Sequence, residues 1–236
     1  VSVGEGFESD LGFIRRKGIF KQFIRYERRF WIETEKITNI SISQNFRYIT
    51  KPNQNSLIMD RDYSASFEIE FQSLANFSID FSYPYTYLDS EFNVTRRDGA
   101  VPIPIGGYNY PNLEISFRNS FFSKFSYSVE IGGGQFFNGT KKSIQARIGY
   151  RIEPIVQTSL NISYDKIELP KPYDTAGLWL IGPKINFTFS KKLFWSNYIQ
   201  YSNIGESLGI NSRLQWRFAP LSDFYLVYND NYFASD

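Results

Sequence analysis

A strict alternation of apolar and polar residues constrains this chain most, and it is clearest in the segment 208–228. Its apolar positions are Leu208, Ile210, Leu214, Trp216 and Phe218, with polar residues between most of them. After a short link at 219–222 the apolar positions resume at Phe224, Leu226 and Tyr228. A period of two is typical of a β-strand, and two such runs joined by a short link with proline predict an antiparallel hairpin.

The same alternation recurs along the chain and predicts about twelve strands. The segments are 19–32, 40–48, 63–71, 77–87, 113–118, 125–131, 144–152, 156–164, 185–189, 195–201, 208–218 and 224–228. In the first segment the phase is ambiguous, because Arg28 falls on the same face as Ile24, Tyr26 and Phe30. Twelve strands of this kind, without a helical pattern, predict an all-β protein.

The connections between these segments alternate in character. Short links lie near 34–37, 73–75, 120–124, 153–155, 190–192 and 219–222, whereas the links 49–61, 88–108, 137–140, 167–176 and 203–207 are longer or carry Gly, Pro and Asn. Outer-membrane barrels have short turns on the periplasmic side and longer loops outside. The alternation therefore predicts a direction for every strand.

Aromatic residues make up 19% of the chain, and they gather at the strand ends. The short-turn ends carry mainly Phe and Trp, for example Phe77 and Trp195, and the loop ends carry mainly Tyr, for example Tyr63 and Tyr83. Two aromatic bands with aliphatic residues between them are typical of the girdles of a lipid-spanning barrel. We therefore predict an antiparallel transmembrane β-barrel of the outer-membrane type. Residues 1–236 are expected to form part of one barrel domain that lacks upstream strands and a final strand.

Composition excludes several other classes of protein. No run of about 18 apolar residues is present, as a transmembrane helix would require. The chain has no Cys and no His, so disulfides, thiolate chemistry, Ser-His hydrolase sites and His-based metal sites cannot be built from it. The net charge of +2 indicates no nucleic-acid partner. We predict no catalytic residues, no metal site and no cofactor.

Charged residues at the polar positions are predicted to line the barrel lumen. They are Arg47, Glu68, Glu70, Asp80, Glu114, Arg118, Glu130, Arg147, Arg151, Arg213 and Arg217, with Lys184 in the same set. They can form a selectivity lining or substrate path, or a wall of cross-strand ion pairs and hydrogen bonds. We favour the wall, since every lumen must be polar, and it predicts mutual pairing among Glu114, Arg118, Glu130, Arg147 and Arg151.

Two smaller groups of residues with side-chain oxygens can be interpreted either as a catalytic or metal-binding site or as ordinary structural polarity. The carboxylates of Glu68, Glu70 and Asp80 could form a glycosidase-like pair, although lumen polarity explains them more simply. A second group could ligate calcium, although loop polarity explains it equally well. That group consists of Asn229, Asp230, Asn231 and Asp236.

A set of aromatic residues near the longer loops is a candidate recognition surface. It consists of Tyr85, Tyr87, Tyr108, Tyr110, Tyr173 and Trp179. These rings could stack on sugars or on a partner protein, but Tyr and Trp are also expected at the level of the lipid headgroups. The pair Asn138 and Gly139 predicts a tight turn.

The run from Leu214 to Tyr232, together with the motif Gly12-Phe13-Ile14-Arg15-Arg16, resembles a known family. It is similar to the uncharacterised C-terminal barrel domain of large outer-membrane proteins that carry a family-9 carbohydrate-binding-like domain at the N-terminus. The resemblance covers the whole chain and implies a barrel fold without catalytic residues to carry over. The binding-like domain is not in this sequence.

The function expected from these observations is that of a non-enzymatic barrel in the outer membrane of a Gram-negative bacterium. It would act as an anchor or platform, or as a transport conduit, in glycan binding or uptake or within a larger outer-membrane complex. The expected partners are outer-membrane lipid, other outer-membrane or periplasmic proteins, and glycans. Two alternatives remain open: a soluble, aromatic-rich antiparallel β-protein that binds carbohydrate, and an outer-membrane hydrolase.

Overall fold

The structure, a computed structural model, describes residues 2–6, 17–32, 34–94 and 99–233. Every regular element within these residues is a β-strand. The strands are β1 (Ser2–Val3), β2 (Ile19–Trp31), β3 (Ile37–Lys51), β4 (Leu57–Phe71), β5 (Asn76–Leu88), β6 (Gly106–Asn109), β7 (Asn112–Arg118), β8 (Phe125–Phe136), β9 (Gly139–Ile152), β10 (Val156–Glu168), β11 (Ala176–Ser190), β12 (Leu193–Ser202), β13 (Ser207–Ala219) and β14 (Ser222–Phe233). No helix in the described part of the chain could span a membrane.

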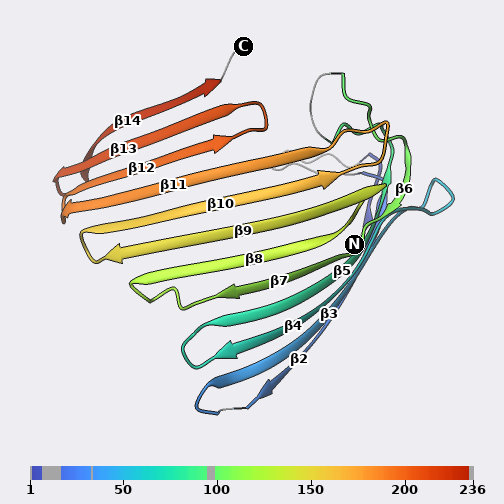
Figure 1. Cartoon of the computed structure of the whole chain (residues 1–236), viewed down its shortest axis with the longest axis horizontal. Helices are drawn as coiled ribbons and strands as arrows, with labels where there is room; N and C mark the ends of the chain where they lie inside the picture. Colours follow the sequence, from blue (N-terminus) through green and yellow to red (C-terminus); the bar gives the residue numbers. More distant parts are fainter. Residues whose placement is uncertain (1, 7–16, 33, 95–98, 234–236) are drawn as a thin grey trace.

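All the strands belong to one antiparallel sheet in which each long strand pairs with the next along the chain. The short strand β6 pairs with the end of β5 and is followed after two residues by β7, which pairs with the rest of β5. The twelve predicted strands are confirmed, and β1 and β6 are additional. Figure 1 shows a curved band with β2 and β14 at opposite edges. The described sheet is open, because β14 forms no ladder with the β1–β2 edge.

One face of this sheet is apolar across neighbouring strands, and we call it the apolar face. Register places Ile79, Ile115, Ile131 and Ile144 opposite one another in a row from β5 to β9. They are not covered: Ile115, Ile131 and Ile144 remain 44%, 55% and 42% exposed. The predicted phase of these strands is confirmed, but their apolar side chains do not form a core within the described chain.

The total accessible surface quantifies this lack of a core. A compact soluble protein of this mass exposes about 11,000 Å². The chain exposes 16042 Å². The sheet therefore depends on something other than its own residues to remove its apolar side chains from water.

Buried apolar residues gather mainly at the loop end of the sheet. Those that are buried among the described residues are Met59, Ala75, Ile103, Ile167 and Ala176. Ile167 and Ala176 are opposite each other on β10 and β11, on the face opposite the apolar face, and are 4% and 1% exposed. Other parts of the chain must therefore cover that face at the loop end.

The edge strand β2 departs from the clean division into two faces. Arg28 is opposite Ile42 and lies on the apolar face, as its sequence position indicated, and its guanidinium stands 5.0 Å from the centre of the Phe30 ring. Trp31 is opposite Asn39 and lies on the other face. Trp31 is therefore not part of the short-turn aromatic band on the apolar face.

The tight turn between β8 and β9 is formed one residue earlier than predicted. Phe137 and Asn138 form it, and Phe137 adopts the left-handed conformation with φ of 50°. Gly139 already belongs to β9, where a Cβ atom would collide with the carbonyl oxygen of Glu168. Gly139 is thus required by the close approach of β10 rather than by the turn.

Candidate functional site: the polar face of the sheet

The face opposite the apolar face carries the predicted lumen residues, and we call it the polar face. Register places Glu70 opposite Asn39, Asp80 opposite Glu114, and Arg147 opposite Ser128. The rest of the set follows the same face by the alternation of each strand, as does Lys184, which is opposite Ser159. The predicted phase is therefore correct for this set.

The predicted lumen carboxylates on β4 and β5 are satisfied by neutral donors. The Asn39 side-chain amide donates to Glu70 Oε2 at 2.6 Å, and the Asn76 amide donates to Glu68 Oε1. Asn39 and Asn76 are buried, at 3% and 8% exposure. The Ser78 hydroxyl donates to Asp80 Oδ2 at 2.6 Å. These bonds hold the carboxylates in place across three strands and give a structural account of the group that resembled a glycosidase pair.

The mutual ion pairs predicted within the lumen set are not formed. Arg47 pairs with Asp62 at 3.4 Å, Arg151 with Glu153 at 2.9 Å and Arg217 with Asp223 at 3.2 Å, so each cation uses a carboxylate from outside the set. One physical reason is register, because Glu130 is opposite Ser116 and Gln145 and Arg147 is opposite Ser128, so no acidic residue of the set stands directly opposite a basic one there; the uneven distribution of charge along the sheet adds to this. Carboxylates occupy β4, β5, β7 and β8, whereas the basic residues lie mainly on β9, β11 and β13.

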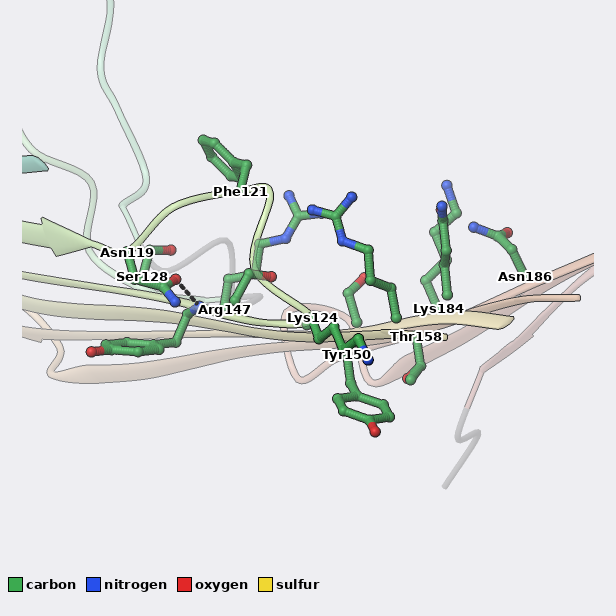
Figure 2. Close-up of a pocket in the computed structure, with 15 residues that line it drawn as sticks. Asn119, Phe121, Lys124, Ser128, Arg147, Tyr150, Thr158, Lys184 and Asn186 are labelled. Atoms are coloured by element: carbon green, nitrogen blue, oxygen red, sulfur yellow. Dashed lines mark hydrogen bonds between the residues drawn. The ribbon is translucent and has the colours of Figure 1, made fainter. Parts of the chain in front are cut away.

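A hollow on the polar face collects four of these cations, and we call it the basic hollow. Lys124, Arg147, Arg151 and Lys184 line it, and its volume is about 280 Å³. Its other lining residues are Asn119, Phe121, Ser126, Tyr127, Ser128, Gly149, Tyr150, Gln157, Thr158, Ser159 and Asn186. Figure 2 shows Arg147, Lys184 and Asn186 on one side of the sheet and Tyr150 on the other. No carboxylate belongs to this lining.

A second hollow of about 450 Å³ adjoins the first. The two share Phe121, Ser128 and Arg147. The second adds Arg118 and Glu130, and the Arg118 guanidinium lies 5.4 Å from the centre of the Phe121 ring. Phe121, in the turn between β7 and β8, thus provides an aromatic surface between two charged hollows. Charge alternation did not identify Phe121 or Lys124, because both lie in a turn outside the predicted strands.

At the opposite, loop end of the sheet an aromatic cluster joins two connections. Phe137 packs against Phe92, Tyr108, Tyr110 and Phe136, with ring centres 4.8 to 5.6 Å apart. The sequence prediction included Tyr108 and Tyr110 but missed the three Phe residues. The adjacent pair Phe136-Phe137 directly before Asn138-Gly139 was the available signal.

The other predicted loop aromatics do not join this cluster through ring contacts. Tyr85 lies beneath the Arg61 guanidinium at 5.7 Å, Trp179 packs against Tyr164 in a tilted arrangement with ring centres 4.3 Å apart, and Tyr87 is opposite Gly107. Tyr173 is close enough to Tyr108 to add to the increase in the pKa of the Tyr108 hydroxyl, which burial causes first. The six residues therefore form several local contacts rather than one surface.

The proposed calcium ligands do not converge within the described residues. Asn229 and Asn231 are opposite Asn211 and Gly209, whereas Asp230 is opposite Ile210 and lies on the other face of β14. Asp236 lies outside the described residues. In the part of the chain that the structure describes, no group of acidic residues is arranged to hold a metal ion.

Comparison with known proteins finds no matching family model, no similar curated protein and no similar solved structure. The resemblance to the outer-membrane barrel domain therefore stays a prediction.

Proposed function

We propose that this chain forms part of the wall of an outer-membrane β-barrel, with its apolar face against lipid and its polar face lining a water-filled lumen. The observation that carries the proposal is the exposed apolar face, which continues from strand to strand without a protein layer over it. Lipid is the environment in which such a face is stable, and a half-apolar strand is sufficient to cross it.

The state of the lumen charges supports a hydrated interior. Arg147 and Lys184 form no ion pair with the described residues, and their charges are stable there only if water or a ligand solvates them. The lack of ion pairs at Arg147 and Lys184 among the described residues differs from the wall of mutually paired charges that the sequence predicted. A conduit therefore agrees better with the polar face than a closed anchor does, and the barrel is proposed as non-enzymatic.

The soluble alternative predicts a carbohydrate-binding surface of aromatic rings. The loop-end cluster is the observation in its favour, since it gathers rings from two connections. Its rings, however, pack against one another rather than facing a ligand. A soluble protein would also leave the apolar face uncovered. We therefore keep glycan recognition as the second candidate function for the loop end.

The test uses the full-length protein expressed in a Gram-negative host, followed by separation of the membranes. We expect it in the outer-membrane fraction, extractable only by detergent, and migrating differently on a gel before and after heating. A protein that stays in the supernatant without detergent, with an unchanged migration, would rule out the barrel and favour the soluble alternative.

A further inference from the structure

The basic hollow contains more positive charge than the protein around it neutralises. Only Arg151, among its four cations, forms an ion pair within the described residues, with Glu153 at 2.9 Å. Arg147, Lys184 and Lys124 have no carboxylate partner there. Among the described residues, Arg118 and Arg213 on the same face also lack an ion pair, but only in the hollow do several such cations line one space without a carboxylate among them.

The strand register explains why these cations face a common space. Arg147 is opposite Ser128 and Asn161, and Lys184 is opposite Ser159, so small or neutral residues separate the long basic side chains. Neighbouring strands are about 4.8 Å apart. β9 and β11 flank β10, so their backbones are about two such spacings apart, a separation that the ends of long Arg and Lys side chains can bridge to one ligand. A concave site with charges of one sign concentrates ions of the opposite sign.

The chemistry of the lining selects an oxyanion. An Arg guanidinium donates two parallel hydrogen bonds to a carboxylate or phosphate, and a Lys ammonium adds a point charge. Asn186, on the same side as Lys184 in Figure 2, adds a neutral amide that can contact a hydroxyl group. The lining offers no carboxylate that would repel an anion.

Phe121 adds an apolar surface to the charged one. Its side chain is 54% exposed and belongs to the lining of both hollows. In Figure 2 it stands above the sheet on the same side as Lys184. A volume of about 280 Å³ is close to the lower limit of small-molecule sites. A ligand with one anionic group and one compact ring matches both surfaces.

We propose that the basic hollow binds a small organic oxyanion of monosaccharide size, a sugar acid or a sugar phosphate. The anionic group contacts Arg147, Lys184, Lys124 and Arg151, and the ring lies against Phe121. The position of this site inside a lumen rests on the proposed function, whereas binding itself does not.

The test is calorimetric titration of the purified full-length protein with galacturonate, glucose 6-phosphate, inorganic phosphate and neutral glucose at matched ionic strength. We expect one of the two organic anions to bind, and which one binds distinguishes the carboxylate from the phosphate ligand. Arg147→Gln and Lys184→Gln should each weaken that binding about tenfold or more, the effect of losing one charge-assisted hydrogen bond. Lys191→Gln, in the exposed turn after β11, removes the same charge outside the hollow and should leave the affinity unchanged.

Several results would overturn the proposal: binding of neutral glucose as tight as that of the organic anion that binds, no binding of either organic anion, or equal losses in Arg147→Gln and Lys191→Gln. Binding of inorganic phosphate as tight as that of the organic anion that binds would overturn the role of the ring and Phe121. Fractionation of the same protein separates the two proposals. If the protein is soluble and Arg147→Gln weakens its anion binding, the binding site is supported and the barrel is ruled out. If the protein is in the outer membrane and binds no anion, the barrel is supported and the binding site is ruled out.

Discussion

The two faces of this sheet differ in what surrounds them, although they share every strand. On β9, Ile144 and Ile148 follow the apolar face and remain about as exposed as the polar Gln145 between them, which faces Glu130 and Ser163. In a soluble sheet one of these sets would be buried against a second layer. Neither set is covered along β9, which is what the proposed barrel requires: an apolar surrounding on one face and an aqueous one on the other.

The largest expected effect tests that difference directly. We expect Ile148→Arg to destabilise the protein by about 2–4 kcal/mol, the cost of a cation that faces the middle of a bilayer. The matched variant Gln145→Arg places the same side chain on the same strand but opposite Glu130, and should cost less than about 1 kcal/mol. The measurement is a denaturant titration of the refolded protein in lipid vesicles. Equal losses in the two variants would mean that the faces do not differ as proposed.

A smaller effect tests how the polar face is held together between β3 and β5. We expect Glu70→Ala to cost about 1–3 kcal/mol, because it leaves the buried Asn39 amide without its acceptor. The control is Glu153→Ala, which removes a carboxylate with 61% side-chain exposure from an ion pair and should cost about 0–1 kcal/mol. The same vesicle titration compares them. If Glu153→Ala costs as much as Glu70→Ala, burial of the amide does not determine the loss.

Most of the fold could be predicted from the sequence, because each strand of this sheet pairs with the next strand along the chain and such pairing needs only local information. Alternation fixes the phase of each strand, and short links fix which strands pair, so residues such as Ile131 and Glu130 were assigned to the correct faces. The turn at Phe137 is an exception with a non-local cause, because it depends on how closely β10 approaches Gly139. On β2 the local pattern placed Arg28 on the correct face but did not show that Trp31 lies on the other one.

The candidate site was less predictable than the fold. Alternation showed that Arg147 and Lys184 point to one face, but their partners depend on which strands are neighbours and on the register between them. Lys124 and Phe121 lie in a turn, where no periodic pattern applies. A list of charges with both signs in similar numbers suggested mutual pairing. Glu130 does lie on the strand between Arg118 and Arg147, yet its register places it opposite Ser116 and Gln145, so neighbouring strands alone did not decide the pairing.

A cation already present on the apolar face allows a finer test. Arg28 is two residues from Phe30 and contacts its ring, so it can reach the aromatic band at the short-turn end. There a charge costs about 0–1 kcal/mol, and we expect Arg28→Leu to change stability by less than about 1 kcal/mol. Ile24 lies on the same face but four residues farther from the band. Ile24→Arg should therefore lower the stability by more than Arg28→Leu changes it. A smaller loss in Ile24→Arg, measured in vesicles, would contradict the position of the band.

The smallest expected effect on stability belongs to Arg147→Gln, and it decides between a conduit and an anchor. Arg147 has no ion-pair partner among the described residues, so its loss leaves no carboxylate unpaired, and the stability should change by less than about 0.5 kcal/mol. Its charge nevertheless faces the proposed lumen, where rings of charge determine which ions pass. In planar bilayers, single channels of the full-length protein should therefore become less selective for anions in Arg147→Gln and stay unchanged in Lys191→Gln. A protein that shows no channel steps at all, in either form, would return the interpretation to an anchor with a closed interior, because a water-filled lumen lined by an unpaired arginine must conduct some ions.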